Sequence, residues 1–322
     1  MFRIFVSVLA SVLLSTGPSW AQDEGGGEAA AGGDVFADAD EAAKQSSNPL
    51  GGDFMVWLNQ WNLDFLQGDI TEDTRNAYTH IFQPVIPIPL EFIGPDWIWV
   101  NRPTLPIIYD AEIPTGPSFS QPGFSEFANK SGLGDIVYFS LLGISRDQES
   151  ELFGDGALVL AGGLTTLWPT GRNLFSDNVW AMGPAGVASY IGDKYIFGVL
   201  AQHWSKYAKE SNGPKEFNLT NAQVFYFKNF SGGWQIGGSP QIVVDWEADG
   251  GDKLSLPIGL GVFKTQIFGG KMPIKFGIEA QYFVARPDTF GTEWRIQFTI
   301  APITPNFVAI AAGLGEMPGG KK

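Results

Sequence analysis

Two histidines, His80 and His203, and the absence of cysteine limit the catalytic or metal chemistry that this sequence can support. His203 stands two residues before Ser205, and side chains two apart lie on the same face of a strand. A serine beside a histidine can serve a lipid hydrolase when a third group orients the histidine. A polar strand end needs no such partner and is the interpretation that we favour. We therefore predict no enzyme activity and no catalytic residues.

Three acids, Glu247, Asp249 and Asp252, gather in a Gly-rich segment and could bind Ca²⁺ through their carboxylate oxygens. The segment lacks the full EF-hand pattern, and solvated loop acids have the same composition. We interpret these residues as loop acids and predict no metal site. Glycine pairs elsewhere, such as Gly162-Gly163, precede no expected helix, so no phosphate-binding loop and no cofactor are predicted.

The beginning of the chain predicts export. Met1 to Arg3 is a short positive segment, Ile4 to Leu14 is apolar, and Ser19-Trp20-Ala21 has small residues where a signal peptidase reads. We therefore predict a signal peptide over residues 1–21, with cleavage between Ala21 and Gln22 and export by the Sec pathway. The apolar run is too short to span a bilayer comfortably.

An acidic segment follows. Residues 22–50 hold seven acids and one base, and their first part is rich in Gly, Ala and Glu. Such a composition offers little to bury, so we expect a flexible periplasmic leader. Asp38 to Ser46 can form one or two helical turns, capped by Asp38 or Asp40 and ended by Asn48-Pro49.

The overall composition favours a membrane barrel. The chain has 11 Trp, 25 Phe and 41 Gly with only 17% charged residues, which is unusual for a water-soluble protein. A barrel with a lipid-facing surface and aromatic girdles requires such a balance. The net charge of −14 argues against nucleic acid as a partner, because phosphate binding needs clustered Lys and Arg.

From residue 51 onward, short segments alternate apolar and polar residues and are separated by Gly, Pro, Asn and Asp. This period of two is typical of barrel strands. We predict an all-β fold, a single antiparallel transmembrane barrel over residues 51–303, with a C-terminal tail over 304–322. A count of ten strands is the alternative, because some segments alternate poorly. The twelve expected strands are 54–66, 75–88, 97–108, 132–144, 156–167, 179–191, 194–204, 217–228, 233–246, 253–265, 271–284 and 292–303.

Loop lengths orient this barrel. Short turns at Gly192-Asp193, 229–232 and Gly269-Gly270 are expected on the periplasmic side, with both termini. Longer outer loops are expected at 109–131, 168–178 and 205–215. Prolines inside the strands cannot donate to the ladder, so we expect bulges or strand ends near them.

The apolar face of each strand is expected to meet lipid, and the polar face is expected to line the lumen. In a pore, such polar side chains select solutes by size, hydrogen bonding and charge. In a narrow barrel they could instead pair with one another and fill the interior. The expected lumen residues are Gln60, Asn62, Asp64, Gln241, Asp245, Lys275, Glu279, Gln281, Arg295 and Gln297.

Several short motifs occur in a characteristic order, beginning with Gln83-Pro84-Val85-Ile86-Pro87, Pro106-Ile107-Ile108-Tyr109 and Gly132-Leu133-Gly134-Asp135-Ile136. Met182-Gly183-Pro184-Ala185, Trp246-Glu247-Ala248-Asp249 and 256–261 follow. In this series the chain resembles bacterial outer-membrane barrels of the "MetA-pathway of phenol degradation" family, labelled as transporters and in part automatically named neuromedin U. The resemblance covers residues 48 to 303 and implies an outer-membrane barrel, sometimes linked with uptake of aromatic compounds. It supplies no catalytic residues.

We therefore expect a Gram-negative outer-membrane channel for small solutes, aromatic or hydrophobic ones among them. Its expected partners are the lipid bilayer, lipopolysaccharide, the barrel assembly machinery and the solute. An outer-membrane lipid hydrolase and a structural barrel without an open pore are the alternatives. The tail after Thr304 departs from barrels that end on an aromatic residue, and it either plugs the barrel or hangs free.

Overall fold

The computed structural model describes residues 38–51, 54–171, 175–269 and 272–314. The predicted signal peptide, its cleavage site and the first part of the acidic leader lie outside the described residues. The elements are α2 (Ala39–Ser46), β1 (Phe54–Gly68), β2 (Thr71–Pro89), β3 (Trp97–Pro117), β4 (Ser125–Leu133), β5 (Ile136–Gln148), β6 (Gly156–Trp168), β7 (Val179–Gly192), β8 (Tyr195–Lys209), β9 (Asn218–Phe230), β10 (Trp234–Gly238), β11 (Gln241–Asp245), the 3-10 turn η2 (Gly250–Asp252), β12 (Leu254–Phe268), β13 (Met272–Ala285), β14 (Gly291–Pro305) and α3 (Phe307–Ala311).

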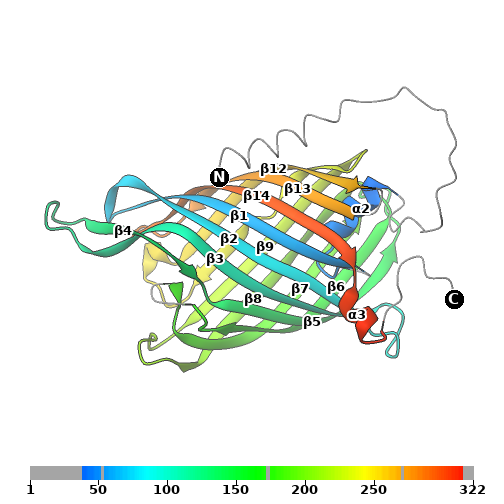
Figure 1. Cartoon of the computed structure of the whole chain (residues 1–322), viewed down its shortest axis with the longest axis horizontal. Helices are drawn as coiled ribbons and strands as arrows, with labels where there is room; N and C mark the ends of the chain where they lie inside the picture. The colour runs from blue at the N-terminus through cyan, green and yellow to red at the C-terminus, as the bar shows by residue number, and fades with distance from the viewer. Residues whose placement is uncertain (1–37, 52–53, 172–174, 270–271, 315–322) are drawn as a thin grey trace.

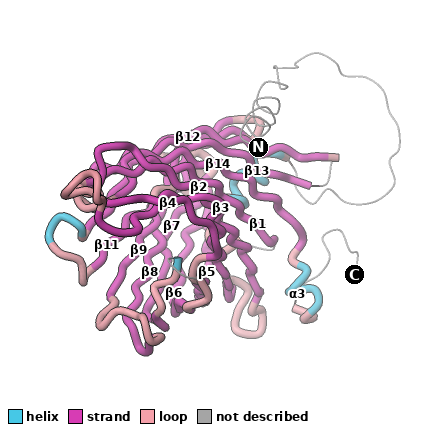
Figure 2. Tube along the Cα trace, turned by 60° about the vertical axis from the view of Figure 1, so that its left-hand side comes forward, coloured by secondary structure: helices cyan, strands magenta, loops and turns pink. Residues whose placement is uncertain are grey.

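The strands form one closed antiparallel barrel (Figures 1 and 2). Closure comes from β1, which pairs with β2 on one side and with β14 on the other, from Phe54↔Pro305 to Gln67↔Gly291. A closed barrel leaves no strand edge with unpaired backbone groups. The prediction of twelve strands is confirmed, and the alternative of ten is wrong.

Two of the twelve strands are interrupted. β4 pairs with the second half of β3 and β5 with its first half, so β4 and β5 form one strand broken at residues 134–135. β10 and β11 both pair with β9 and are separated by Ser239 and Pro240. Pro240 has no N–H to donate, which accounts for the interruption at that point.

The two faces of the wall differ as the alternation predicts. On β12, Ile258 and Leu260 are 61% and 63% exposed on the outside. On β13 the buried positions Lys275, Glu279 and Gln281 alternate with more exposed residues, so their side chains face inward. The exterior therefore presents a band of exposed apolar side chains.

The two ends of the barrel are built differently (Figure 1). The helix end carries α2, α3 and the short turns after β7, β9 and β12. The hairpin end carries the β3–β4 hairpin, which extends beyond the wall. The predicted outer loop over 109–131 is wrong, because β3 continues to Pro117 and β4 begins at Ser125, which leaves only 118–124 as a loop. The predicted outer loop over 205–215 is likewise wrong at its start, because β8 extends to Lys209.

Both terminal segments pack on the barrel as far as they are described. Asn306 donates from Nδ2 to the carbonyl of Pro87 and accepts from Ala309 N, which caps α3 beside β2. The C-terminal tail therefore begins as a strand end and a docked helical turn, and residues 315–322 lie outside the described part. Among the described residues no helix is both long enough and apolar enough to cross a membrane.

Candidate functional site: the lumen and its N-terminal plug

The half of the lumen near the helix end is apolar. One cluster of buried side chains takes members from β1, β2, β3, β5, β6, β7, β8, β9, β12 and β14. Side chains from strands around a closed wall can meet only inside it. The sequence analysis expected a polar interior throughout, and this half differs because Phe139, Leu141 and Leu200 turn inward.

A segment from before the barrel fills this apolar zone. Leu50 is 0% exposed and belongs to the same cluster, and residues Ser46 to Pro49 line a cavity together with wall residues. We call α2 with residues 47–50 the plug. The sequence analysis placed residues 22–50 in a flexible leader with a helix over Asp38 to Ser46, and α2 is that helix, with Asp38 as its cap. It did not predict that this helix and residues 47–50 enter the barrel. Burial of the apolar Leu50 side chain among wall residues stabilises the docked segment. Strand alternation gives no information about this contact, because Leu50 lies outside the strands.

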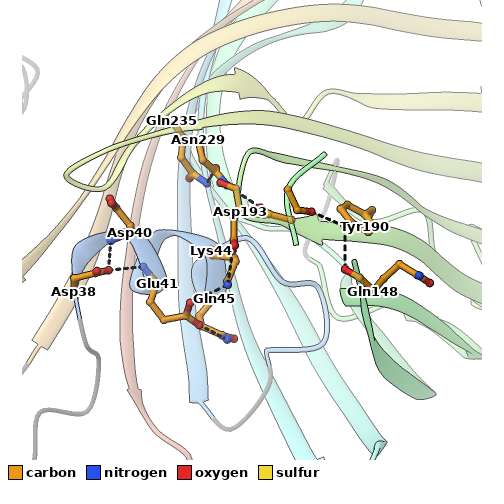
Figure 3. A network of polar contacts seen from close by, with 12 residues as sticks. Asp38, Asp40, Glu41, Lys44, Gln45, Gln148, Tyr190, Asp193, Asn229 and Gln235 are labelled. Carbon is orange, nitrogen blue, oxygen red and sulfur yellow. Dashed lines mark hydrogen bonds and ion pairs between the residues drawn. The ribbon is translucent and has the colours of Figure 1, made fainter. Parts of the chain in front are cut away.

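The helix of the plug lies inside the mouth of the barrel. Asp38 accepts from Asp40 N and Glu41 N, both at 2.9 Å, and so caps the first turn (Figure 3). Ala42 is fully buried and packs near Ile303 of β14. Small residues at this face allow α2 to approach the wall closely.

Charged contacts join the helix to the turns of the wall. Lys44 Nζ lies 2.9 Å from Asp193 Oδ1 and 3.0 Å from Glu41 Oε2 (Figure 3). Burial by itself lowers the pKa of Lys44, but the hydrogen bonds to Asp193 and Glu41 outweigh it and raise the pKa above 10.5. Gly233 N also donates to Asp40.

Deeper in the lumen, the plug is bonded to two strands. Lys275 Nζ of β13 donates to Ser47 Oγ at 2.8 Å. Gln235 of β10 lies 3.3 Å from the same hydroxyl and also donates to Asn229 at 2.8 Å. Ser47 therefore ties the plug to the wall at a point beyond the contacts of Lys44 and Asp40.

The predicted lumen residues lie on inward positions of β1, β11, β13 and β14. Gln60, Asn62, Asp64, Lys275, Glu279, Gln281 and Gln297 are buried, and Gln241, Asp245 and Arg295 are half-buried. The structure brings several of them together. The pairs are Arg295 with Asp64 at 2.7 Å, Gln281 with Glu279 at 2.9 Å, and Gln241 with Asn221 of β9 at 3.0 Å.

Pairing among these side chains is incomplete. Buried polar atoms of Asn62, Gln281 and Gln297 have no hydrogen-bond partner in the protein. Buried polar groups normally find a partner in protein or water, so these atoms require water or a solute. Pairing among the side chains of the polar half therefore leaves some of their buried polar atoms unsatisfied.

Sequence reasoning missed three residues that matter here, namely Ser47, Leu50 and Arg102. Arg102 is buried on β3, and its Nη2 donates to Gln83 Oε1 at 3.0 Å. Its inward position could have been found from strand alternation, because Arg102 lies three residues after the exposed Trp99 and therefore on the opposite face of β3. For Ser47 and Leu50 the sequence contains no such signal.

A cavity of about 100 Å³ lies between the plug and the wall. Its apolar lining includes Leu58, Val85 and Phe225, and its charged lining consists of Arg102 and Lys275. It adjoins both the apolar zone and the polar zone. The lumen thus contains an amphipathic space that the plug closes on one side.

The two histidines lie on the other face of the wall. His203 Nδ1 is 2.8 Å from Thr220 Oγ1, and Ser205 Oγ is 3.3 Å from His203 Nε2. Trp246 Nε1 donates to the same threonine at 2.9 Å. His80 lies 3.0 Å from Asn59 Oδ1 on β1. These residues do not face the lumen.

The acidic segment near η2 forms loop contacts. Asp252 accepts from Thr289 N at 2.7 Å and Thr289 Oγ1 at 2.5 Å, and these bonds lower the pKa of Asp252. Its carboxylate therefore links the β11–β12 loop to the β13–β14 loop. Within the described part of the chain, no three His, Asp or Glu side chains are grouped to hold a metal, Glu247 and Asp249 included.

A scan of protein-family models gives no match for this chain, and a search of curated proteins gives none either. Solved structures do resemble it. An outer membrane channel from Pseudomonas putida F1 matches with a TM-score of 0.50 and 11% identity, over 78% of this chain and 95% of that chain. A mutant of the Rh. blastica porin matches with a TM-score of only 0.23 and 9% identity, over 78% and 98%. At such identities the first match supports the barrel fold alone.

Proposed function

We propose that this chain is an outer membrane channel for small amphipathic or hydrophobic solutes, closed at rest by its own N-terminal plug. The observation that carries the proposal is the pairing of an exposed apolar exterior, as at Leu260, with an interior whose polar groups remain partly unpaired. A wall of this kind suits lipid outside and solute inside. The barrel fold shared with the Pseudomonas putida channel supports it.

The same proposal includes the finer expectations. The chain belongs to the outer-membrane family of the phenol-degradation type, is exported by Sec, and is inserted by the barrel assembly machinery beside lipopolysaccharide. Its helix end faces the periplasm and its hairpin end faces outward. The apolar zone around Phe139 and Leu200 favours solutes with an apolar body.

The test begins with location and closure. The full chain is expected in the outer-membrane fraction, with faster migration on a detergent gel before heating than after it. In planar bilayers, we expect low conductance from the wild type and higher conductance from a Lys44→Met, Asp193→Asn double variant, whose plug has lost its ion pair. Lys228→Met, which alters a side chain near the outer Tyr195 ring, is the control. A barrel in which neither form conducts or passes solute is a structural barrel, and the proposal is then wrong.

A second candidate function rests on the contact between Ser205 and His203. A neutral His203 that donates from Nδ1 to Thr220 leaves Nε2 free to accept the Ser205 proton. Ser205 Oγ would add to the carbonyl carbon of a lipid ester while His203 takes its proton. The ester C–O bond then breaks, His203 returns the proton to the leaving alkoxide, and water releases the fatty acid.

Thr220 carries no charge, so it would stabilise a protonated histidine less well than an aspartate, and we expect slow hydrolysis. Fatty-acid release from phospholipid vesicles by the wild type, lost in Ser205→Ala and in His203→Asn, would support this function. Ser231→Ala in a distant turn is the control. A wild type that releases no fatty acid rejects it.

A further inference from the structure

Two buried cations border the cavity beside the plug. Arg102 on β3 is 7% exposed and Lys275 on β13 is 5% exposed, and both line the same space. Neither takes part in an ion pair among the described residues. Burial of a charge without an opposite charge is costly, so two such groups at one cavity require an explanation.

The hydrogen-bond partners of Arg102 do not satisfy all of its N–H donors. Its Nη2 donates to Gln83 Oε1 at 3.0 Å, and its guanidinium lies 5.0 Å from the centre of the Phe139 ring. Its Nε has no hydrogen-bond partner at all. A guanidinium has five N–H donors arranged to bind a carboxylate through two of them, so this side chain has donors to spare.

The hydrogen-bond and ring partners of Lys275 are also neutral, and Glu279 acts on it through charge without a hydrogen bond or ion-pair contact. Its ammonium group bonds to Ser47 Oγ and lies 4.5 Å from the centre of the Phe227 ring and 5.1 Å from that of Phe263. Glu279, four residues along the same strand face, is bonded to Ser239 N and Gln281. The nearest inward acid on β13 is therefore engaged elsewhere.

The remaining lining is mixed. Leu58, Val85, Leu200, Phe225 and Phe263 supply an apolar and aromatic part, and Gln60, Gln223, Ser239, Thr299 and the plug residues Ser46 to Asn48 supply uncharged polar groups. The volume is about 100 Å³. A dry protein cavity of roughly 150 Å³ holds benzene, so one small ring is the right order of size once the plug yields slightly. The aromatic part of the lining thus suits a compact apolar body, and Arg102 and Lys275 suit a negative charge.

We propose that this cavity is a binding subsite for a small aromatic carboxylate, whose charge is held by Arg102 and Lys275 and whose ring packs among the phenylalanines. The inference rests on the proposed channel function and names its substrate class. On binding, the carboxylate replaces the Ser47 hydroxyl as the acceptor for Lys275. The solute therefore competes with the tie that holds the plug, and occupancy of the subsite favours release of the plug.

The test is calorimetric titration of the full purified chain in detergent micelles with benzoate. Benzamide, which has the same ring without the charge, and acetate, which has the charge without the ring, are the matched ligands. Benzoate is expected to bind, and both matched ligands are expected to bind at least about tenfold more weakly. Equal binding of benzamide, or no binding of benzoate, overturns the proposal.

Variants locate the site. Arg102→Gln and Lys275→Met are each expected to weaken benzoate binding about tenfold or more, whereas Lys228→Met on the outer face leaves it unchanged. Heat-modifiable gel migration identifies the variants that fold. If Arg102→Gln does not fold, Lys275→Met and the ligand comparison still decide. Unchanged benzoate affinity in a folded variant overturns the assignment.

Measurements of conductance and solute flux distinguish a failure of the proposed subsite from a failure of the proposed channel. Conductance or solute flux without benzoate binding leaves the channel in place and rejects the subsite. Benzoate binding without conductance in the wild type or in the Lys44→Met, Asp193→Asn variant keeps the subsite and rejects the channel. Benzoate-dependent opening, absent in Lys275→Met, supports both.

Discussion

Lys275 and Ser47 lie 228 residues apart in sequence, and their side chains meet at 2.8 Å inside the barrel. One belongs to the wall and the other to the segment that precedes it. A hydrogen bond from a charged donor contributes more than a neutral one, roughly 1.5–3 kcal/mol. This contact therefore adds to the ion pair of Lys44 with Asp193 in holding the plug.

Replacement of Ser47 by alanine removes the acceptor of that bond. We expect Ser47→Ala to raise the open fraction in planar bilayers by about tenfold, because the plug loses its bonds to Lys275 and Gln235. Ser46→Ala, whose hydroxyl bonds only to the carbonyl of Ala43 within the plug, is the matched control. Equal conductance of the two variants would mean that the plug does not move through this contact.

The ion pair of Lys44 predicts a response to alkaline pH. Because the docked state raises the pKa of Lys44, its stabilisation is complete below pH 10.5 and is lost as the pH rises through the higher value of the docked state. Conductance of the wild type is expected to increase above pH 10.5. Lys44→Met should conduct more at neutral pH and lack this step. A step of the same size in Lys44→Met would assign it to another group.

Asp64 and Arg295 face each other across the β1–β14 seam at 2.7 Å. Removal of one member leaves a buried charge without its partner, so Arg295→Ala is expected to cost about 3 kcal/mol of unfolding free energy. The Asp64→Asn, Arg295→Gln double variant should recover part of this loss. Urea titration in detergent, followed by the gel-migration shift, measures both. A double variant no more stable than Arg295→Ala would contradict the pairing argument.

Asp135 lies in the break between β4 and β5 and holds the loop after β6. Its carboxylate accepts from Gly171 N and from Asp177 N, both at 2.8 Å. Asp135→Ala is expected to free this loop, and limited proteolysis should then cut near residues 169–178 while the wall stays intact. Asp147→Ala, an exposed acid at the far end of β5, is the control. Resistance equal to the wild type would show that the loop is held by other contacts.

Leu260 tests whether the exposed apolar band faces lipid. Arginine on the lipid face of a barrel costs about 2–4 kcal/mol at the bilayer midplane. Leu260→Arg should therefore destabilise the barrel in lipid vesicles by that amount. Gly250→Arg, at a loop site where a side chain meets nothing within 4 Å, should change stability by less than about 0.5 kcal/mol. No loss for Leu260→Arg would place this face in water.

Strand positions could be predicted because they depend on local pattern. Period-two alternation placed β12, β13 and β14 within a few residues of their observed bounds. The β3–β4 hairpin was missed because its residues are polar and carry prolines, as loops do. Its strands are held by pairing with each other, beyond the wall.

The candidate site was predictable only in part. Parity identified inward polar residues such as Glu279 and Gln281, because a strand alternates its faces strictly. Whether these residues select solutes stays a prediction. The alternation of strand residues did not reveal the apolar zone around Phe139. The strands there carry small or apolar residues on both faces, so no polar face marks the inward side.

By itself, the sequence determined a twelve-stranded antiparallel wall with an apolar outer face, because strand formation and facing follow from neighbouring residues. Only the tertiary structure decided that residues 39–50 enter the lumen, that Ser47 meets Lys275, and that Arg102 shares a cavity with it. These contacts join residues far apart in the chain. They form only when closure of β1 on β14 encloses an apolar space that Leu50 can fill.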